Sequence, residues 1–274
     1  MFKIINKVGL AKDITKIIVE APQIAKKARA GQFVVVMAGE KAERIPLTLA
    51  DWDKAQGTIT LIFQKVGYST KMLGLLNPDD KIKHILGPLG HATEIRNIGT
   101  VICIGGGVGI AEVYPVSRAF KEIGNRVIGI IGARSKDLII LESQMRSVSD
   151  ELFITTDDGS YSKKGLVTDS LKELFEVIEK STHTKYPGLV YCIGPVAMMK
   201  AVSEFTKDYQ IKTIVSLNPV MVDATGMCGS CRCKVGGNTV FGCVDGPDFD
   251  GHQVDFDGLN KRTKLFIEEE KRAV

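Results

Sequence analysis

The sequence lacks any apolar run close to the roughly 20 residues that a membrane-spanning helix needs. Its first segment, MFKIINKVGLAKDITKIIVEA, alternates like a pair of strands and is interrupted by charged residues. It therefore has neither the apolar core nor the small-residue cleavage site of a signal peptide. We expect a cytoplasmic protein that has no membrane partner.

The chain also lacks a strong excess of charge of either sign. Its formal net charge is +4, and its 36 basic residues are scattered among 32 acidic ones rather than gathered in a stripe. Proteins that bind nucleic acid usually concentrate positive charge on one face, so we expect no nucleic-acid partner. Hydrophobic residues make up 44% and charged ones 25%, which is ordinary for a globular protein.

No internal repeat divides the 274 residues, so the hydrophobic pattern has to define the domains. Residues 1–97 contain short alternating runs separated by Gly, Pro and charged clusters, which predicts a small antiparallel β-barrel. In residues 98–218, buried strand runs alternate with helical ones, which predicts an α/β domain with a parallel sheet of the doubly wound class. Residues 219–274 are rich in loop residues and end in a charged helix or tail, so they predict a small third domain.

A glycine run, VICIGGGVGIAEV, joins a predicted strand to a predicted helix in the second domain. It lacks the spaced G-x-G-x-x-G fingerprint, and a plain tight turn would have the same composition. Strand, glycines and helix nevertheless come in the order that lets a pyrophosphate reach the N–H groups at the helix start, and we favour this interpretation. Two further strand ends, TTDDGS (155–160) and CIGPVAMM (192–199), would meet this turn at one edge of a parallel sheet.

Two short motifs stand out in the predicted barrel, RIPLT (44–48) and VGYST (66–70). Alone, the RIPLT motif is a weak signal for a binding site, because Arg44 could cap a turn and Pro46 could mark an edge strand. Together they place an arginine and a threonine hydroxyl at a strand, and then a glycine and two hydroxyls at a helix start. This combination offers one site for a flavin ring and another for its phosphates.

With GPLG, IGGGVGIA, GAR, DDGS and C-x-G-P following in order, nearly the whole chain resembles the ferredoxin–NADP reductase superfamily. In that superfamily a barrel binds FAD and a second domain binds a nicotinamide nucleotide. Within it, the chain is similar to the electron-transfer subunits of dihydroorotate dehydrogenase. It is still more similar to the small FAD- and cluster-bearing subunits of NADH-dependent ferredoxin:NADP oxidoreductase, an electron-bifurcating complex.

The resemblance implies cofactor contacts for particular residues of this sequence. The residues implied to hold FAD are Arg44, Pro46, Leu47 and Thr48 at its ring and ribityl part, and Gly67, Ser69 and Thr70 at its pyrophosphate. Those implied to line the nucleotide site are Gly106, Gly107, Gly109, Asp158 and Gly194, with Cys192 near the nicotinamide. Judged from its strand alone, Cys192 would be a core thiol.

Four of the six cysteines lie close together in CGSCRCKVGGNTVFGC (228–243). In a reducing compartment such groups are more often metal or redox sites than disulfides. The electron-transfer subunits carry C-x4-C-x2-C and one later Cys, the spacing of a two-iron cluster. The resemblance therefore implies Asp223, Cys228, Cys231 and Cys243 as ligands, since the small bifurcating subunits are similar in using an aspartate first. Cys233 would share a face with Cys231 in an extended segment, so an all-cysteine set stays open.

A structural zinc ion is the alternative occupant of this segment. Zinc ribbons usually pair two C-x2-C units, whereas this run contains one. The flavin and nucleotide motifs favour an iron–sulfur cluster, because zinc has no redox chemistry to share with them.

Hydride transfer moves two electrons whereas a [2Fe–2S] cluster accepts one, so a flavin is the component that connects them. By the resemblance we expect an oxidoreductase subunit in which NAD(H) exchanges hydride with FAD, and FAD exchanges single electrons with the cluster. A larger flavin/iron–sulfur partner in a heterodimer would react with NADP(H) and ferredoxin. No catalytic acid or base is predicted. The alternatives are a dihydroorotate dehydrogenase subunit, which Asp223 in place of Cys disfavours, and a zinc-stabilised nucleotide-binding redox sensor.

The choice of nucleotide rests on the resemblance. Arg134 and Lys136, in GARSKD, could bind the 2′-phosphate of NADP(H), or they could form a solvated turn. Because the small bifurcating subunits use NAD(H), we expect NAD(H) here.

Overall fold

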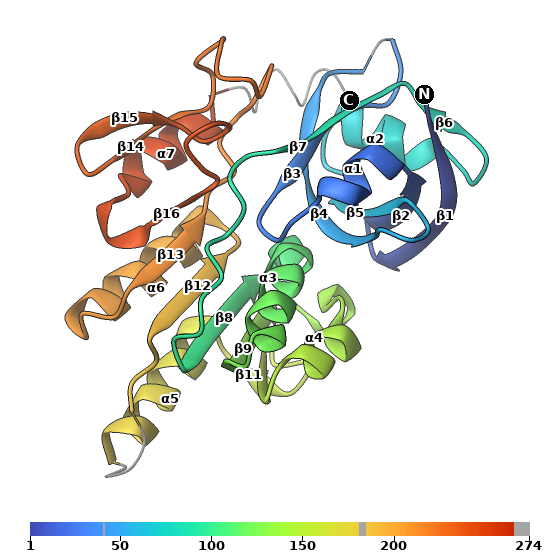
Figure 1. Cartoon of the computed structure of the whole chain (residues 1–274). Coiled ribbons are helices and arrows are strands. Elements are labelled where there is room, and N and C mark those ends of the chain that lie inside the picture. Colours follow the sequence, from blue (N-terminus) through green and yellow to red (C-terminus); the bar gives the residue numbers. More distant parts are fainter. Residues whose placement is uncertain (41, 181–184, 266–274) are drawn as a thin grey trace. The chain divides into compact units, whose positions relative to one another are not determined.

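The computed structural model describes residues 1–40, 42–180 and 185–265, which form two compact units (Figure 1). The first unit contains Met1–Thr93, Leu217–Asp248 and the described residues from Asp255 onward. The second contains Glu94–Ser216 and Phe249–Val254. The three-domain division of the sequence stays a prediction. The charged helix or tail expected at the end of the chain lies partly in residues 266–274, outside the described residues.

The first unit is built on a nearly closed antiparallel sheet with the strand order β6-β1-β2-β5-β4-β3-β7. Its strands are β1 (Phe2–Ala11), β2 (Ile14–Glu20), β3 (Phe33–Met37), β4 (Ile45–Asp53), β5 (Thr58–Gln64), β6 (Lys81–Ile82) and β7 (His84–Leu89). Two helices accompany them, α1 (Pro22–Lys27) and α2 (Tyr68–Leu75). The two edge strands follow each other directly in the chain. The predicted antiparallel barrel is confirmed.

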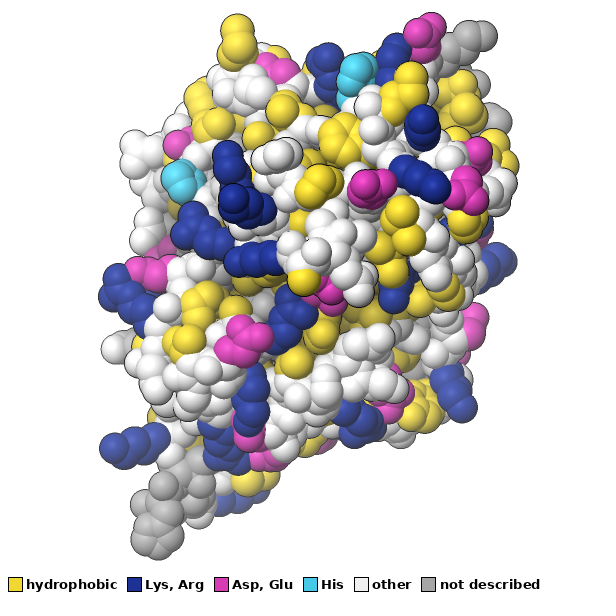
Figure 2. All heavy atoms as spheres, turned by 45° about the vertical axis from the view of Figure 1, so that its right-hand side comes forward, with side chains coloured by type: hydrophobic (Ala, Val, Ile, Leu, Met, Phe, Trp, Pro, Cys, Tyr) yellow, Lys and Arg dark blue, Asp and Glu magenta, His cyan; other side chains and the backbone are white. Residues whose placement is uncertain are grey.

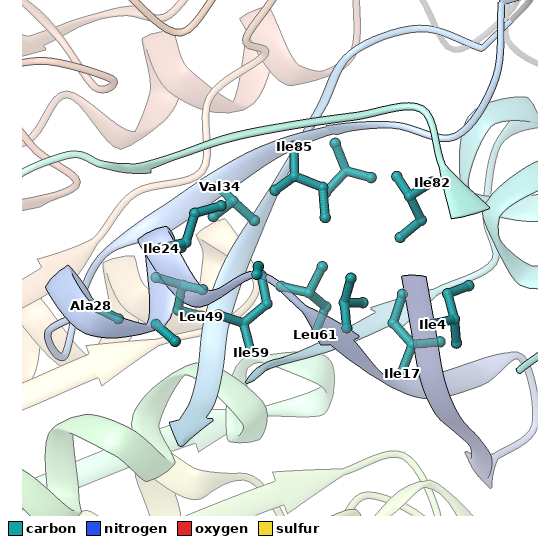
Figure 3. Packing of buried hydrophobic residues seen from close by; sticks show 14 of the residues in the cluster. Ile4, Ile17, Ile24, Ala28, Val34, Leu49, Ile59, Leu61, Ile82 and Ile85 are labelled. Atoms are coloured by element: carbon teal, nitrogen blue, oxygen red, sulfur yellow. The ribbon is translucent and has the colours of Figure 1, made fainter. Parts of the chain in front are cut away.

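Alternation along the barrel strands places one set of side chains inside. Ile17 of β2, Leu49 of β4 and Leu61 of β5 are fully buried, and their side chains converge in the view of Figure 3. Successive residues of a strand point to opposite faces, so each of these residues has neighbours that face away from the core. The alternating pattern in the sequence is the reason that the barrel could be predicted.

The second unit is built on a seven-stranded sheet with the order β11-β10-β9-β8-β12-β13-β16. Its elements are β8 (Thr100–Gly106), η1 (Gly107–Gly109), α3 (Ile110–Glu122), β9 (Arg126–Ala133), η2 (Lys136–Leu138), α4 (Glu142–Val148), β10 (Glu151–Thr156), β11 (Lys163–Lys164), α5 (Val167–Lys180), β12 (Leu189–Ile193), α6 (Val196–Asp208) and β13 (Thr213–Ser216). The pairs from β11 through β13 are parallel.

The helices of the second unit cover both faces of this sheet. Helices α3 and α4 pack together on one face, α3 against β8 and β9 and α4 against β9 and β10, while α5 and α6 pack together against the sheet on the other face (Figure 1). The central strand β8 is therefore apolar after Thr100, and Val101, Ile102 and Ile104 are fully buried. The predicted doubly wound α/β domain is confirmed.

The cysteine-bearing segment folds against the barrel. It contains the hairpin of β14 (Arg232–Val235) and β15 (Asn238–Phe241), and then α7 (Phe256–Thr263). Between them, β16 (Asp248–Asp250) adds the last strand to the sheet of the second unit, and η3 (Gly251–Gln253) also belongs to that unit. Cys231 and Cys243 belong to one buried cluster with Phe33 and Val35 of β3. The loops around the cysteines are thus held by the same unit as the barrel.

Within the described residues, no helix is both long enough and apolar enough to cross a bilayer. Lys and Arg side chains are distributed over the face shown in Figure 2, with acidic side chains near several of them.

Candidate functional site

The two glycine motifs of the second unit meet at the point where its sheet changes direction. From the central strand β8 the chain builds outward through β9 and β10, and then returns to place β12 and β13 on the other side of β8. The helices that follow β8 and β12 lie on opposite faces of the sheet. Gly106 ends β8 and Gly194 follows β12. Open α/β sheets bind ligands at the carboxyl ends of their strands at such a switch point.

Three of the predicted glycines allow these strand ends to approach each other. A Cβ on Gly109 would lie 2.6 Å from the carbonyl oxygen of Ile193, and one on Gly106 would lie 2.4 Å from Met198 Sδ. A Cβ on Gly194 would lie 2.5 Å from Met198 Cε and 3.2 Å from Gly106 Cα. Gly107 has φ +57° and open space around it, so its need for glycine is conformational. The structure therefore brings Gly106, Gly109 and Gly194 together.

Asp158 lies in the exposed turn after β10 and joins that turn to the loop after β9. Its Oδ1 accepts a hydrogen bond from Ser160 N at 2.9 Å, and hydrogen bonds from Ser160 hold the pKa of Asp158 below its usual value. Its own N–H donates to Arg134 O at 3.1 Å, and Lys136 N donates to Ser160 Oγ at 2.8 Å. Asp158, Arg134 and Lys136 therefore gather at the same edge of the sheet.

Cys192 is fully buried within β12. Burial raises its pKa, so the thiol stays neutral. This matches the core thiol that the strand pattern alone indicates, and its placement near a nicotinamide stays a prediction.

In the first unit, one hydrogen bond links the second predicted flavin motif to Glu43, the residue before the first motif. Arg44 is exposed immediately before β4, and Pro46, Leu47 and Thr48 are half-buried residues of β4 that pair with β3. Ser69, in the first turn of α2, is buried, and its Oγ accepts a hydrogen bond from Glu43 N at 2.9 Å. This bond ties the start of α2 to the loop before Arg44, and nothing in the local sequence pattern indicated it.

Thr70 uses its hydroxyl to shape the start of α2. Its Oγ1 accepts hydrogen bonds from Val66 N at 3.0 Å and Gly67 N at 3.1 Å, and donates to Gly67 O at 2.9 Å. Because the first N–H groups of a helix have no intrahelical partner, the backbone from Tyr68 to Thr70 offers anion-binding donors. The hydroxyl of Thr70 thus fixes the loop, and the backbone supplies the groups that suit a phosphate.

The predicted cluster ligands lie around one loop of the first unit. Asp223 Oδ2 accepts a hydrogen bond from Cys228 N at 2.8 Å, and Oδ1 accepts one from Thr225 N at 2.9 Å. Cys231 Sγ lies 3.1 Å from Cys243 Sγ. Burial raises the pKa of Cys243 to about 12, and the neighbouring Cys231 and Asp223 act in the same direction. A metal would have to displace the proton of this thiol on binding.

Cys233, the fifth candidate ligand, has different neighbours. Its thiol is buried and donates to Cys231 O at 3.4 Å. Burial raises its pKa to about 11, while the positive charge of Arg262 acts in the opposite direction. The negative charge of Asp223 raises the pKa of Cys243, whereas the charge of Cys231 raises the pKa of Cys233. Asp223 and Cys233 each lie near another candidate ligand, so the choice between these two residues stays a prediction.

The donor set fits a two-iron cluster better than a single zinc ion. Across residues 1–40, 42–180 and 185–265, no three His, Cys, Asp or Glu side chains are close enough to hold one metal ion. A structural zinc ion needs four ligands around one centre, whereas a [2Fe–2S] cluster spreads its four ligands over two irons. One carboxylate and three thiols around a glycine-containing loop are compatible with the second arrangement.

Two arginines that the motif comparison did not single out also bind this loop. Arg232 Nη1 donates to Gly229 O at 3.0 Å, and Arg262 Nη2 donates to Ser230 O at 2.9 Å. Arg262 belongs to a run of basic residues that is typical of a solvated helix face. No local signal in the sequence could have linked it to the cysteines.

Comparison with known proteins shows which family carries this combination of sites. Residues 218–255 match the iron–sulfur cluster binding domain of dihydroorotate dehydrogenase B. A Thermotoga maritima protein, described as a homolog of the dihydroorotate dehydrogenase B (NAD(+)) electron transfer subunit, is 43% identical over 269 residues, which cover 98% of this chain and 93% of that protein. The chain belongs to this family of electron transfer subunits and their homologs.

Solved structures extend the comparison to the whole fold of this electron transfer subunit homolog. One chain from a study of flavin-based electron bifurcation by the NADH-dependent reduced ferredoxin-NADP oxidoreductase is 42% identical, with a TM-score of 0.93. The match covers 100% of this chain and 96% of that one. Ferredoxin-NADP+ reductase from Plasmodium falciparum shares the fold, with a TM-score of 0.60 at 12% identity, over 78% of this chain and 95% of that one.

The family and fold expected from the sequence are therefore confirmed. The chain is an NAD(H)-dependent oxidoreductase subunit whose cofactors are FAD, a [2Fe–2S] cluster and NAD(H). The Thermotoga relative is named a homolog of an electron transfer subunit, and the pairing of this chain with a larger subunit stays a prediction. The individual residues that hold each cofactor stay predictions.

Proposed function

We propose that this subunit exchanges hydride between NAD(H) and FAD and passes single electrons between FAD and its [2Fe–2S] cluster. A larger partner subunit would then react with NADP(H) and ferredoxin. The observation that carries this proposal is the double role of β3. Its Phe33 and Val35 pack against Cys231 and Cys243, and the same strand pairs with Pro46 to Thr48 of β4. Strand β3 thus contacts both β4, the proposed flavin-binding strand, and the loop that carries the proposed cluster ligands.

The flavin site has two parts in this proposal. Arg44 supplies an exposed positive charge beside β4, and the N–H groups of Tyr68 to Thr70 bind the pyrophosphate. Ser69 and Thr70 hold the loops that form the site, through Glu43 N and Gly67 respectively. When bound, FAD supplies the exchange between two-electron and single-electron transfer.

The nucleotide site lies at the switch point of the second unit. Gly106, Gly107 and Gly109 let a pyrophosphate approach the backbone at the start of α3, and Asp158 and Gly194 flank the approach. Lys136 supports NAD(H) rather than NADP(H), because its ammonium lies over the Tyr161 ring, 4.9 Å from the ring centroid. A cation that already has a partner is less available to a 2′-phosphate.

A dihydroorotate dehydrogenase partner is the second candidate, because both the matched domain and the Thermotoga relative carry that name. Asp223 in the first ligand position favours the bifurcating complex over this candidate. The cytoplasmic location expected from the sequence stays a prediction.

The test is anaerobic stopped-flow reduction of the cofactor-loaded protein, with a Cys243→Ser variant as the control. We expect NADH to bleach the flavin and then the cluster absorption in the unaltered protein, and only the flavin in C243S. NADPH should act much more slowly. Failure of NADH to reduce the flavin would reject the proposal, and equal rates with both nucleotides would reject its assignment of NAD(H).

A further inference from the structure

Two guanidinium groups bind consecutive carbonyls of the loop between Cys228 and Cys231. Arg232 reaches Gly229 O from β14, and Arg262 reaches Ser230 O from α7, at 3.0 and 2.9 Å. The loop is only two residues long between its cysteines, so both of its internal carbonyls have a charged donor. Hydrogen bonds from charged donors are roughly twice as strong as those between neutral groups.

These contacts also orient the N–H groups of the loop. In a trans peptide the C=O and the following N–H point in opposite directions. A guanidinium on the carbonyl of Gly229 therefore turns the N–H of Ser230 the other way, and this N–H donates to Cys228 Sγ at 3.4 Å. The carbonyl of Ser230 and the N–H of Cys231 are related in the same way, so Arg262 fixes the second peptide of the loop.

Helix α7 is anchored so that Arg262 reaches the loop. Asp255 N donates to Lys234 O of β14 at 2.9 Å, and Asp255 Oδ1 caps the helix by accepting from Gly258 N at 2.9 Å. Phe256 and Leu259 are buried, and half-buried Arg262 follows Leu259 by three residues on the same side of the helix. The segment that matches the iron–sulfur domain ends at residue 255, so this helix lies beyond it.

We propose that Arg262 is a positioning residue that fixes the Cys228–Cys231 loop and raises the reduction potential of the cluster, an inference that rests on the proposed function. Reduction adds negative charge to the cluster, so a nearby guanidinium and N–H groups directed at the sulfurs favour the reduced form. Arg262 acts from outside the ligand segment, as a neighbour that orients the ligands.

The test compares three variants of the cofactor-loaded protein. Arg262→Gln removes the charge and shortens the donor, and Arg262→Lys keeps the charge without the planar fork. Lys261→Gln is the matched control, because Lys261 is exposed on the same helix and, among the described residues, no hydrogen bond or ion pair joins its ammonium to the loop. The measurements are the cluster midpoint potential from an EPR-monitored titration, and the rate of iron loss to a chelator.

We expect R262Q to titrate at a lower potential than the unaltered protein and to lose iron on the order of 10-fold faster. K261Q should match the unaltered protein in both. An R262Q midpoint equal to that of K261Q would overturn the inference. If R262Q cannot be loaded, R262K carries the test. It should keep the original midpoint but lose iron faster, and iron retention as long as in the unaltered protein would contradict a positioning role.

The same measurements separate this inference from the proposed function. Unaltered protein that takes up neither iron nor flavin would reject the proposed function itself. Unaltered protein that loads and responds to NADH, together with an unshifted R262Q, would reject only the role of Arg262.

Discussion

Asp223 uses both carboxylate oxygens to fold the loop that carries the proposed cluster ligands. The oxygens accept hydrogen bonds from Thr225 N and Cys228 N. These bonds hold the pKa of Asp223 below its usual value, and the bond from Thr225 has the largest effect. A carboxylate is a harder donor than a thiolate, so as a ligand it would favour ferric iron. A single residue would then shape the loop and set the electronic character of the cluster.

Replacing Asp223 with Cys should therefore change the EPR spectrum and the midpoint potential of the cluster. The matched control is Asp245→Asn, because the Asp245 carboxylate also folds this segment by accepting from Phe241 N at 2.6 Å but is outside the proposed ligand set. We expect D245N to keep the original spectrum. An unchanged spectrum and potential in D223C would instead favour Cys233 as the fourth ligand.

At the scale of elements, the turn from β8 into α3 shows how packing restricts the proposed nucleotide site. Gly109 is the last residue before α3, and the neighbouring end of β12 leaves no room for a side chain at this position. The obstructing atom is the backbone oxygen of Ile193, which cannot move without shifting the strand. The geometry of this turn therefore depends on the packing of β8 against β12.

Gly109→Ala should destabilise the second unit by about 1–3 kcal/mol, the usual cost of overpacking. It should also slow flavin reduction by NADH while flavin and iron contents stay the same. Gly39→Ala is the control, since a Cβ there would meet nothing within 4 Å. Thermal unfolding and stopped-flow rates give the two readouts, and a G109A protein as stable and as fast as G39A would show that the turn tolerates a side chain.

Elements were predictable from the sequence where the signal was local. The alternating pattern of β2 and β5 and the continuous apolar run of β8 each identify a strand without knowledge of its partners. The bonds of Ser69 to Glu43 and of Arg262 to Ser230 could not be predicted, because each joins residues that are far apart in the sequence. The candidate site residues came mostly from a family resemblance, and packing then gave Gly106, Gly109 and Gly194 a physical reason.

At the scale of the whole molecule, the chain passes repeatedly between its two units. It crosses after Thr93, after Ser216, after Asp248 and after Val254. The short excursion at 249–254 packs in the second unit, where His252 Nε2 lies 3.1 Å from Thr206 Oγ1 and Gly251 lies close to Ser203. It begins a few residues after Cys243, so the segment that carries the last proposed ligand is directly continuous in sequence with the second unit.

The account as a whole requires flavin and iron together in one chain. The most direct measurement is an ultraviolet–visible spectrum of anaerobically purified protein, with iron, zinc and flavin determined on the same sample and NADH then added. We predict one flavin and two irons per chain, and loss of both absorptions on reduction. Colourless protein that contains stoichiometric zinc, with neither iron nor flavin, would contradict the electron-transfer account and identify the cysteines as a structural metal site.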